Sequence, residues 1–251
     1  MAQLYAVFMN GGAGTGGTAV PTERTSGLPT SSNGASSFHL WWDTVGAATE
    51  YSATLEVLST PTEARIAFWA LGCAFVNISP TVSGVGGAHA GLQWMPLHPN
   101  SRAINWGGYL TATGAELPGS VSSLPSAPNN PNTRDFNWIA GRKYRFRVFS
   151  PAANTWRATV TDLVTNTTTT IRDLTCNATH LGSPVVWTEA FTDCGTTSYH
   201  CRWTDLTAVI NSVPVDASSV YLTYQSVENG GCSNTNSFSD GTGIVQRVNT
   251  T

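Results

Sequence analysis

The chain has 251 residues, of which 41% are apolar and only 11% are charged, and its formal net charge is −3. An average soluble protein carries about 25% charged residues, so solubility must come from Thr, Ser, Asn and Gly. The small negative charge excludes a general nucleic-acid-binding protein, and no apolar run approaches the roughly 18 residues of a membrane-spanning helix.

The chain opens with a short apolar run, LYAVFM, at residues 4–9. Six residues are fewer than the roughly 7–15 of a signal-peptide core, and no charged segment comes before them. We therefore expect a first strand in a mature secreted chain, whose leader was removed and whose Met1 was added for expression. A natural protein without a leader is the alternative. The neutral, Thr-rich composition is common in secreted proteins.

Strand patterns recur along the sequence, and no window has the apolar spacing of a capped amphipathic helix. Clusters of Gly, Pro, Asn and Ser separate the strands. This pattern predicts an all-β protein, a two-sheet β-sandwich of the jelly-roll or concanavalin-like type, in a single domain over residues 1–251. The expected strands span residues 4–9, 37–43, 51–58, 64–71, 73–78, 89–95, 105–111, 143–149, 155–163, 168–173, 184–191, 206–211 and 219–226.

Two long segments are rich in Gly, Ser, Thr and Pro and carry few apolar residues. They lie near residues 11–37 and 113–135. Long loops in a compact domain are usually functional or mobile. Each segment is therefore expected to cross the surface as a loop or to form a binding loop.

Two adjacent tryptophans stand in the expected strand 37–43. Because successive side chains of a strand face opposite sides, Trp42 faces the core together with Phe38 and Leu40. Trp41 shares the other face with a histidine and a carboxylate. It is either a half-covered residue or a platform on which a flat ligand, such as a sugar ring, stacks.

A glycine-rich segment, GGAHAGLQW at residues 86–94, precedes FNWIAGRKYRFRV at residues 136–148. With FHLWWDT before them and WRATVTD after them, this order resembles a family of poorly characterised secreted bacterial proteins with concanavalin-like sandwiches. The likeness covers roughly residues 37–165, about half the chain. It implies a jelly roll and an extracellular protein among carbohydrates, and it supplies no catalytic residues. The matching positions are Gly91, Leu92, Gln93, Trp138, Gly141, Tyr144, Phe146 and Val148.

The five cysteines contain no CxxC pair, which argues against a zinc site of the common kind. We expect a local disulfide between Cys194 and Cys201 and a second one between Cys176 and Cys232. Other pairings stay open, because connectivity cannot be read from sequence. Cys73 lies in an apolar run and is expected to be a free, buried thiol. No histidine belongs to an HxH or HExxH motif, so we expect neither a metal nor a cofactor.

One acidic pair in a strand context has the spacing of catalytic carboxylates, Glu189 and Asp193 in VVWTEAFTDC. On a straight strand the two would share a face about 13 Å apart. A retaining glycosidase needs about 5–5.5 Å, so this pair could act together only if the strand bends.

The densest cluster of polar and aromatic residues spans residues 187–205. Rigid aromatic side chains bury a large area and lose little entropy on binding. We therefore expect a ligand contact here, while a loop that serves stability alone is the alternative. The expected ligand-binding residues are Trp41, Gln93, Tyr199, His200 and Trp203.

These features favour a secreted, lectin-like protein that recognises a polysaccharide or a cell-wall glycan through exposed aromatic residues. One alternative is a polysaccharide-degrading enzyme, either a glycoside hydrolase or a lyase, that uses Glu189 and Asp193. The other is a structural subunit of an extracellular assembly, whose Thr-rich strands would meet edge to edge and form a homo-oligomer.

Overall fold

The computed structural model describes residues 23–44, 46–77 and 85–249, and this part of the chain is almost entirely β-structure. Its helical structure is limited to one 3-10 turn, η1 (Pro99–Ser101). The predicted all-β class is confirmed, whereas the expected strand 4–9 lies outside the described residues. None of the helical structure in the described ranges has the length and apolarity to cross a membrane.

The strands are β1 (Ser36–Asp43), β2 (Ala48–Val57), β3 (Ala67–Val76), β4 (Gly86–Trp94), β5 (Arg102–Leu110), β6 (Thr133–Asp135), β7 (Lys143–Ala152), β8 (Thr155–Asp162), β9 (Thr167–Thr175), β10 (His180–Ala190), β11 (Tyr199–Ile210), β12 (Val213–Asp216), β13 (Ser219–Tyr224), β14 (Asn236–Ser239) and β15 (Ile244–Val248).

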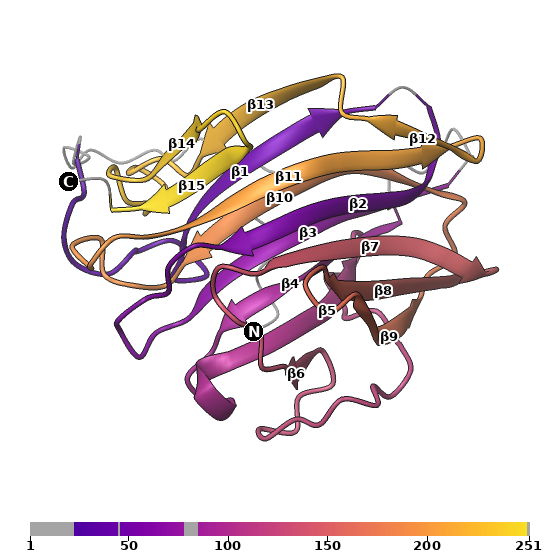
Figure 1. The fold of residues 1–251 in the computed structure, drawn as a ribbon, viewed down its shortest axis with the longest axis horizontal. Helices are drawn as coiled ribbons and strands as arrows, with labels where there is room; N and C mark the ends of the chain where they lie inside the picture. Colours follow the sequence, from indigo (N-terminus) through magenta and orange to yellow (C-terminus); the bar gives the residue numbers. More distant parts are fainter. Residues whose placement is uncertain (1–22, 45, 78–84, 250–251) are drawn as a thin grey trace.

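The strands form two antiparallel sheets of a β-sandwich. The first, called the site sheet here, has the order β13-β1-β10-β3-β4-β5-β6. The second, the back sheet, has the order β14-β15-β11-β2-β7-β8-β9, with β12 added to β11. One pairing, between Leu181 and Ala48, joins the two sheets. Figure 1 shows their long strands crossing the molecule side by side, with β13 and β14 near one edge and β6 at the other.

The core lies between the two sheets and is held by aromatic contacts that cross from one sheet to the other. Trp69 of β3 meets Tyr199 of β11 edge to face, with 6.3 Å between ring centroids. Phe75 of β3 packs on Trp156 of β8 at 5.2 Å. Trp42 is buried in the same core, as strand alternation predicts. Such aromatic pairs contribute about 0.5–1.5 kcal/mol each beyond the area that they bury.

The two strands expected at residues 64–71 and 73–78 are one continuous strand, β3. Gly72 marks no break, because it pairs with His89 of β4 inside the ladder. Its missing side chain makes room for Trp187: a Cβ at this position would lie 2.3 Å from that ring. A glycine is present here because Trp187 packs closely against the sheet, and not because the chain turns.

The expected strand 206–211 is only the end of β11, and four short strands were not expected at all: β6, β12, β14 and β15. Each of these four strands has three to five residues, and all four residues of β12 are exposed. Segments this short carry too few alternating positions for periodicity to reveal them. They form strands because their backbones pair with the edge of a neighbouring strand.

The expected pairing of the cysteines is wrong. Cys194 bonds to Cys232, with 5.5 Å between their Cα atoms. Cys201 and Cys176 are free and buried, and Cys73 is free and buried as expected. The physical reason is strand alternation: β11 begins just before Cys201 and turns its side chain into the core, whereas Cys194 lies in the loop beyond β10.

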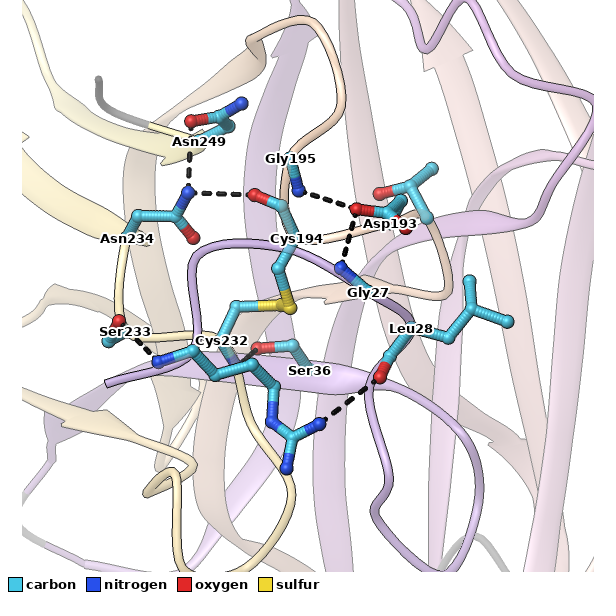
Figure 2. The surroundings of a disulfide bond; sticks show 12 residues. Gly27, Leu28, Ser36, Asp193, Cys194, Gly195, Cys232, Ser233, Asn234 and Asn249 are labelled. Atoms are coloured by element: carbon cyan, nitrogen blue, oxygen red, sulfur yellow. Dashed lines mark hydrogen bonds between the residues drawn. A yellow bond between two sulfur atoms is a disulfide. The ribbon is translucent and has the colours of Figure 1, made fainter. Parts of the chain in front are cut away.

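The disulfide is the centre of a network that ties three distant segments together (Figure 2). Asp193 Oδ1 accepts hydrogen bonds from the backbone N–H groups of Gly27, at 2.9 Å, and Gly195, at 2.7 Å. Asn234 Nδ2 donates to the Cys194 carbonyl oxygen at 2.7 Å. The network therefore holds the segment before β1 and the segment before β14 against the end of β10.

Loss of the disulfide should lower stability in a way that identifies its partners. The bond closes a loop of 38 residues, which corresponds to about 4 kcal/mol of chain entropy. We expect a reductant to lower the unfolding midpoint of the wild type and of Cys201→Ala alike, and to leave a Cys194→Ala/Cys232→Ala double variant unaffected. If Cys201→Ala alone abolished the response to reductant in denaturant titrations, the pairing described here would be incorrect.

Candidate active site

Three side chains form one row across the face of the site sheet that points away from the core. Glu189 of β10 is paired with Phe68 of β3, and Phe68 is paired in turn with Gln93 of β4. Residues directly opposite each other in antiparallel strands point to the same side. Glu189 and Gln93 therefore flank Phe68, and their backbones are two strand spacings, about 9–10 Å, apart.

A cavity of about 380 Å³ opens over this row. The glutamate and the glutamine both line it, together with Phe68 and residues of β4 and β5. One wall is the segment 128–133, which belongs to the long loop expected near residues 113–135. The interpretation of that loop as a binding loop is therefore compatible with its position.

Glu189 is a buried carboxyl group that accepts a hydrogen bond from Asn33. Its side chain is 2% exposed, and Asn33 Nδ2 donates to its Oε1 at 2.7 Å. Burial raises the pKa of Glu189 to about 8, an effect that the Asn33 hydrogen bond opposes only in part. Glu189 therefore keeps its proton in acidic and neutral solution.

The turn before β1 positions Asn33. Its Oδ1 accepts a hydrogen bond from Ser31 Oγ at 2.8 Å and one from the backbone N–H of Ala35 at 3.2 Å. Because the amide oxygen is held in this way, the amide nitrogen points at the carboxyl group. The segment before β1 thus supplies a group that supports Glu189 from outside the sheet.

Gln93 brings an amide group to the other side of the cavity. Its side chain is buried, yet Oε1 has no hydrogen-bond partner among the residues that the structure describes. A buried polar atom without a partner costs about 1–3 kcal/mol, so this oxygen is available to a bound molecule or to water. The strand itself is fixed from behind, because Trp138 Nε1 donates to the Gln93 carbonyl oxygen at 3.1 Å.

The wall beside this pair is aromatic and uncharged. Phe68 meets His89 at 5.3 Å and Trp187 at 6.1 Å, both edge to face. Burial lowers the pKa of His89 to about 4, so its imidazole is neutral above that pH. Farther along, Asn105 Nδ2 donates to Thr133 Oγ1 at 2.9 Å. The described residues contain no group of three or more His, Cys, Asp or Glu side chains arranged for a metal ion.

Two of the expected ligand-binding aromatics lie in the core, and this part of the sequence analysis is wrong. Tyr199 is 0% and Trp203 1% exposed. Tyr199 Oη is 3.0 Å from Thr192 Oγ1, and Trp203 Nε1 donates to Gln246 Oε1 at 3.1 Å. They are buried because β11 is flanked by strands on both sides and directs every second residue inward.

The other expected residues are separated from Glu189 and Gln93. His200 points away from the core, with Nδ1 2.9 Å from Ser59 Oγ. Trp41 is half-covered by β13: its Nε1 donates to Thr223 Oγ1 at 2.9 Å, and its ring stacks on Tyr221 at 6.2 Å. Asp193 follows the end of β10 and belongs to the disulfide network, so it does not pair with Glu189.

The sequence points to Glu189 and Gln93 at different sites, and it gives no sign of Asn33 or Phe68 as site residues. Residues 93 and 189 are 96 positions apart, and only the pairing of both strands with β3 brings them together. The available signal was alternation: it places Gln93 on the same face of its strand as His89, opposite Leu92.

No protein-family model and no curated protein matches the sequence. Among solved structures, the chain is similar to scytalido-glutamic peptidase with a peptide-based transition-state analogue, at 14% identity, 85% coverage of this chain, 98% coverage of that chain and a TM-score of 0.50. A structure of the same peptidase with a transition-state analogue inhibitor is 13% identical, with 88% coverage of this chain, 99% coverage of that chain and a TM-score of 0.49. SCP-B, an eqolisin-family peptidase in complex with the tripeptide Ala-Ile-His, is 13% identical, with 90% coverage of this chain, 100% coverage of that chain and a TM-score of 0.47. The first likeness shows a shared fold.

These findings correct the functional hypothesis drawn from the sequence. The expectation of a lectin-like, carbohydrate-binding protein of concanavalin type is wrong, because the solved structure with which the chain shares its fold at a TM-score of 0.50 is that of scytalido-glutamic peptidase. The burial of Tyr199 and Trp203 removes two of its expected stacking residues. The alternative of a polysaccharide-degrading enzyme also loses its basis, because Asp193 is not in the cavity with Glu189.

The protonated state of Glu189 should make stability depend on pH. The folded protein holds this proton up to about pH 8, whereas the ordinary value is 4.5. The folded state therefore binds more protons between these limits, and stability is full below about pH 4.5 and falls as the pH rises toward 8. The difference between the two pKa values corresponds to a loss of about 5 kcal/mol in the free energy of unfolding between pH 4.5 and pH 8.

Glu189→Gln should flatten this profile, because the amide does not ionise. Denaturant titrations at pH 4.5, 6 and 8 measure it, and the exposed Glu228→Gln serves as the matched control that should keep the wild-type slope. A Glu189→Gln profile parallel to that of the wild type would show that the carboxyl group is not held protonated by the fold.

Proposed function

We propose that this protein is a secreted peptidase that hydrolyses peptide bonds with Glu189 and Gln93. The observation that carries the proposal is the single row on the site sheet from which a buried carboxyl group and a buried amide enter one cavity. The shared fold with a protein named as a glutamic peptidase supports it. A fold alone does not specify a function, whereas the side chains of a site do.

The two side chains have complementary capacities for amide hydrolysis. A protonated Glu189 can give its proton to the carbonyl oxygen of the substrate while its other oxygen accepts a proton from the attacking water. The C–O bond then forms, and the carboxyl group is protonated again. In the second step Glu189 protonates the leaving nitrogen and takes a proton from a hydroxyl group of the intermediate, and the C–N bond breaks.

Gln93 contributes through its amide N–H₂ group. A donor held in place near the substrate carbonyl stabilises the charge that develops on oxygen in the transition state. The strand fixes the backbone of Gln93, so the donor needs little reorganisation. Desolvation in the buried site strengthens both interactions, since charges interact more strongly at low dielectric constant.

Secretion is the compartment that the composition and the disulfide support. Disulfides such as Cys194–Cys232 persist in oxidising surroundings and are rare in the cytosol. A protonated catalytic carboxyl group also suits an enzyme that works in acidic to neutral media. Detection of the mature protein in the culture medium of its native host would test this assignment.

Substitution of either residue should strongly reduce cleavage without unfolding the protein. We expect Glu189→Gln to lower kcat/KM by about 10²–10⁴-fold and Gln93→Ala by about 10²–10³-fold. Cleavage of an unfolded protein substrate, followed by mass spectrometry, measures the loss, and Glu228→Gln is the control at an exposed site. Wild-type rates in Glu189→Gln would contradict the proposal.

The pH dependence should follow the protonated form of Glu189. Because burial raises its pKa to about 8, activity should persist on the acidic side and disappear as the pH rises through that value. Initial rates measured from pH 3 to 10 with a substrate that has no ionisable side chain test this directly. A rate that increases above pH 8 would require a different proton donor.

A further inference from the structure

We propose that Asn33 is a positioning residue that keeps the acid proton of Glu189 on Oε2, and that the Cys194–Cys232 disulfide controls the site by anchoring the segment that carries Asn33. This inference rests on the proposed peptidase function and names what regulates its site. Asn33 is half-buried in the turn before β1, and the described lining of the cavity does not include it. It therefore acts on the carboxyl group and not on a bound peptide.

The direction of one hydrogen bond decides which oxygen of Glu189 carries the proton. The backbone N–H of Ala35 can only donate, and it donates to Asn33 Oδ1. The amide nitrogen of Asn33 is therefore the atom that faces Glu189 Oε1, at 2.7 Å. An amide N–H₂ group can also only donate, so Oε1 must accept. Because a carbonyl oxygen accepts better than a hydroxyl oxygen, the proton of the neutral carboxyl group lies on Oε2.

This placement gives the two oxygens of Glu189 fixed roles in hydrolysis. In the first step the water oxygen bonds to the substrate carbon, the carbonyl oxygen takes the π electron pair and the Oε2 proton, and Oε1 accepts the water proton through its second lone pair. In the second step the C–N electron pair moves to nitrogen, which takes the Oε1 proton, and a hydroxyl proton of the intermediate returns to Oε2. Asn33 favours this return, because Oε1 accepts its hydrogen bond best without a proton.

Backbone hydrogen bonds tie the segment before β1 to one end of the disulfide. The N–H group of Gly27 donates to Asp193 Oδ1 at 2.9 Å. The carbonyl oxygen of Gly27 accepts a hydrogen bond from the N–H group of Cys194, also at 2.9 Å. Figure 2 shows Gly27 next to both residues, beside the sulfur atoms. The start of the segment is therefore fixed to the end of β10, the strand that carries Glu189.

The turn that contains Asn33 also contacts the loop before the other cysteine. The N–H group of Thr30 donates to the carbonyl oxygen of Gly230 at 3.0 Å. Gly230 has a φ of 84°, and a Cβ at this position would clash with the backbone nitrogen of Ser31. Ser31 Oγ in turn donates to Asn33 Oδ1 at 2.8 Å. Because Gly230 lies two residues before Cys232, the disulfide holds this loop against the turn.

The ionisation of Glu189 reports on the Asn33 hydrogen bond. Burial raises the pKa of Glu189 to about 8, whereas the Asn33 hydrogen bond lowers it, because a donor favours the ionised carboxylate. All the variants compared below keep the other titratable or charged groups on this face of the sheet, except where Asp193 itself is replaced. These groups are His39 and Asp43 of β1, His89 of β4 and Tyr109 of β5, with Glu116, Glu23, Arg24 and Asp193 on the adjoining loops.

An NMR titration of the Glu189 carboxyl carbon tests the hydrogen bond without requiring cleavage. Glutamate labelled with ¹³C at the side-chain carboxyl group is incorporated, and the signal that Glu189→Gln lacks is followed from pH 4 to 10. We expect Asn33→Ala to raise the midpoint by at least about one pH unit, a tenfold fall in the acid dissociation constant. Asn177→Ala, at an exposed position, is the matched control and should keep the wild-type midpoint.

Initial rates from pH 3 to 10 test the placement of the proton. Asn33→Ala should lower kcat by up to about 100-fold with KM unchanged, and it should move the alkaline limit of activity upward. In Asn33→Asp the introduced carboxyl group donates to Oε1 while it is protonated, so activity should persist in acid. When the two groups share one proton, that proton lies at Oε1 and Oε2 has none. This variant should therefore lose activity at a lower pH than the wild type.

The role of the disulfide is tested by the same NMR titration. Cys194→Ala/Cys232→Ala should raise the Glu189 midpoint in the direction of Asn33→Ala. Adding Asn33→Ala to it should shift the midpoint by less than Asn33→Ala alone does, because coupled residues are not additive. Asp193→Ala keeps the disulfide but removes the acceptor of the Gly27 N–H group, and it should act in the same direction.

The outcomes separate the role of Asn33 from the function on which it rests. A Glu189 midpoint that is unchanged or lower in Asn33→Ala, or an unchanged kcat in an otherwise active enzyme, would overturn the inference. Full additivity of Asn33→Ala with the cysteine and Asp193 variants would overturn the role of the disulfide. If the midpoints shifted as expected while the wild-type protein cleaved no peptide, the proposed peptidase function would fail and the hold of Asn33 on the proton would stand.

Discussion

The register of three neighbouring strands is the constraint on which the candidate site depends. Pairing of β10 and β4 with opposite edges of β3 places Glu189, Phe68 and Gln93 in one row. A shift of either strand by one residue would turn its side chain toward the core. The large core fixes this register, because Thr188 and Leu92, the sequence neighbours of the two site residues, are both buried on its side.

The two faces of the site sheet have different roles. The inner face carries the large aromatic residues that join the sheets, and it belongs to the larger of the two buried apolar clusters. The outer face carries a smaller buried cluster, Phe68, Ala70, Val185 and Trp187, with Trp41 packed against it. This cluster lines one side of the row with apolar groups and lowers the local dielectric constant. The same desolvation raises the pKa of Glu189 and makes its amide neighbour effective.

Much of the fold could be predicted from the sequence, because long strands show their alternation directly. Tyr144, Phe146 and Val148 are buried while Lys143 and its alternating neighbours point outward. Short strands such as β6 could not be found, since their structure comes from the neighbouring edge and not from their own pattern. The disulfide could not be found either, because it joins a loop after β10 to a turn before β14 and depends on how the sheets assemble.

The residues of the site could be predicted from the sequence only in part, for a similar reason. Composition and motif singled out Gln93 and Glu189 separately, but their pairing is a property of sheet order, which one sequence does not specify. The clustering of aromatic and polar residues near Tyr199 was misleading, because strand alternation there serves the core. Exposure cannot be inferred from residue type alone, since Trp is highly buried on average and Tyr is intermediate in burial.

The most direct measurement is a crystal structure of the protein with a peptide-based transition-state analogue. We expect the tetrahedral centre to lie over Phe68, with one of its oxygens within hydrogen-bond distance of the Glu189 carboxyl group and of the Gln93 amide. An analogue bound elsewhere, or one that contacts neither side chain, would contradict the claim that this row is the reacting centre.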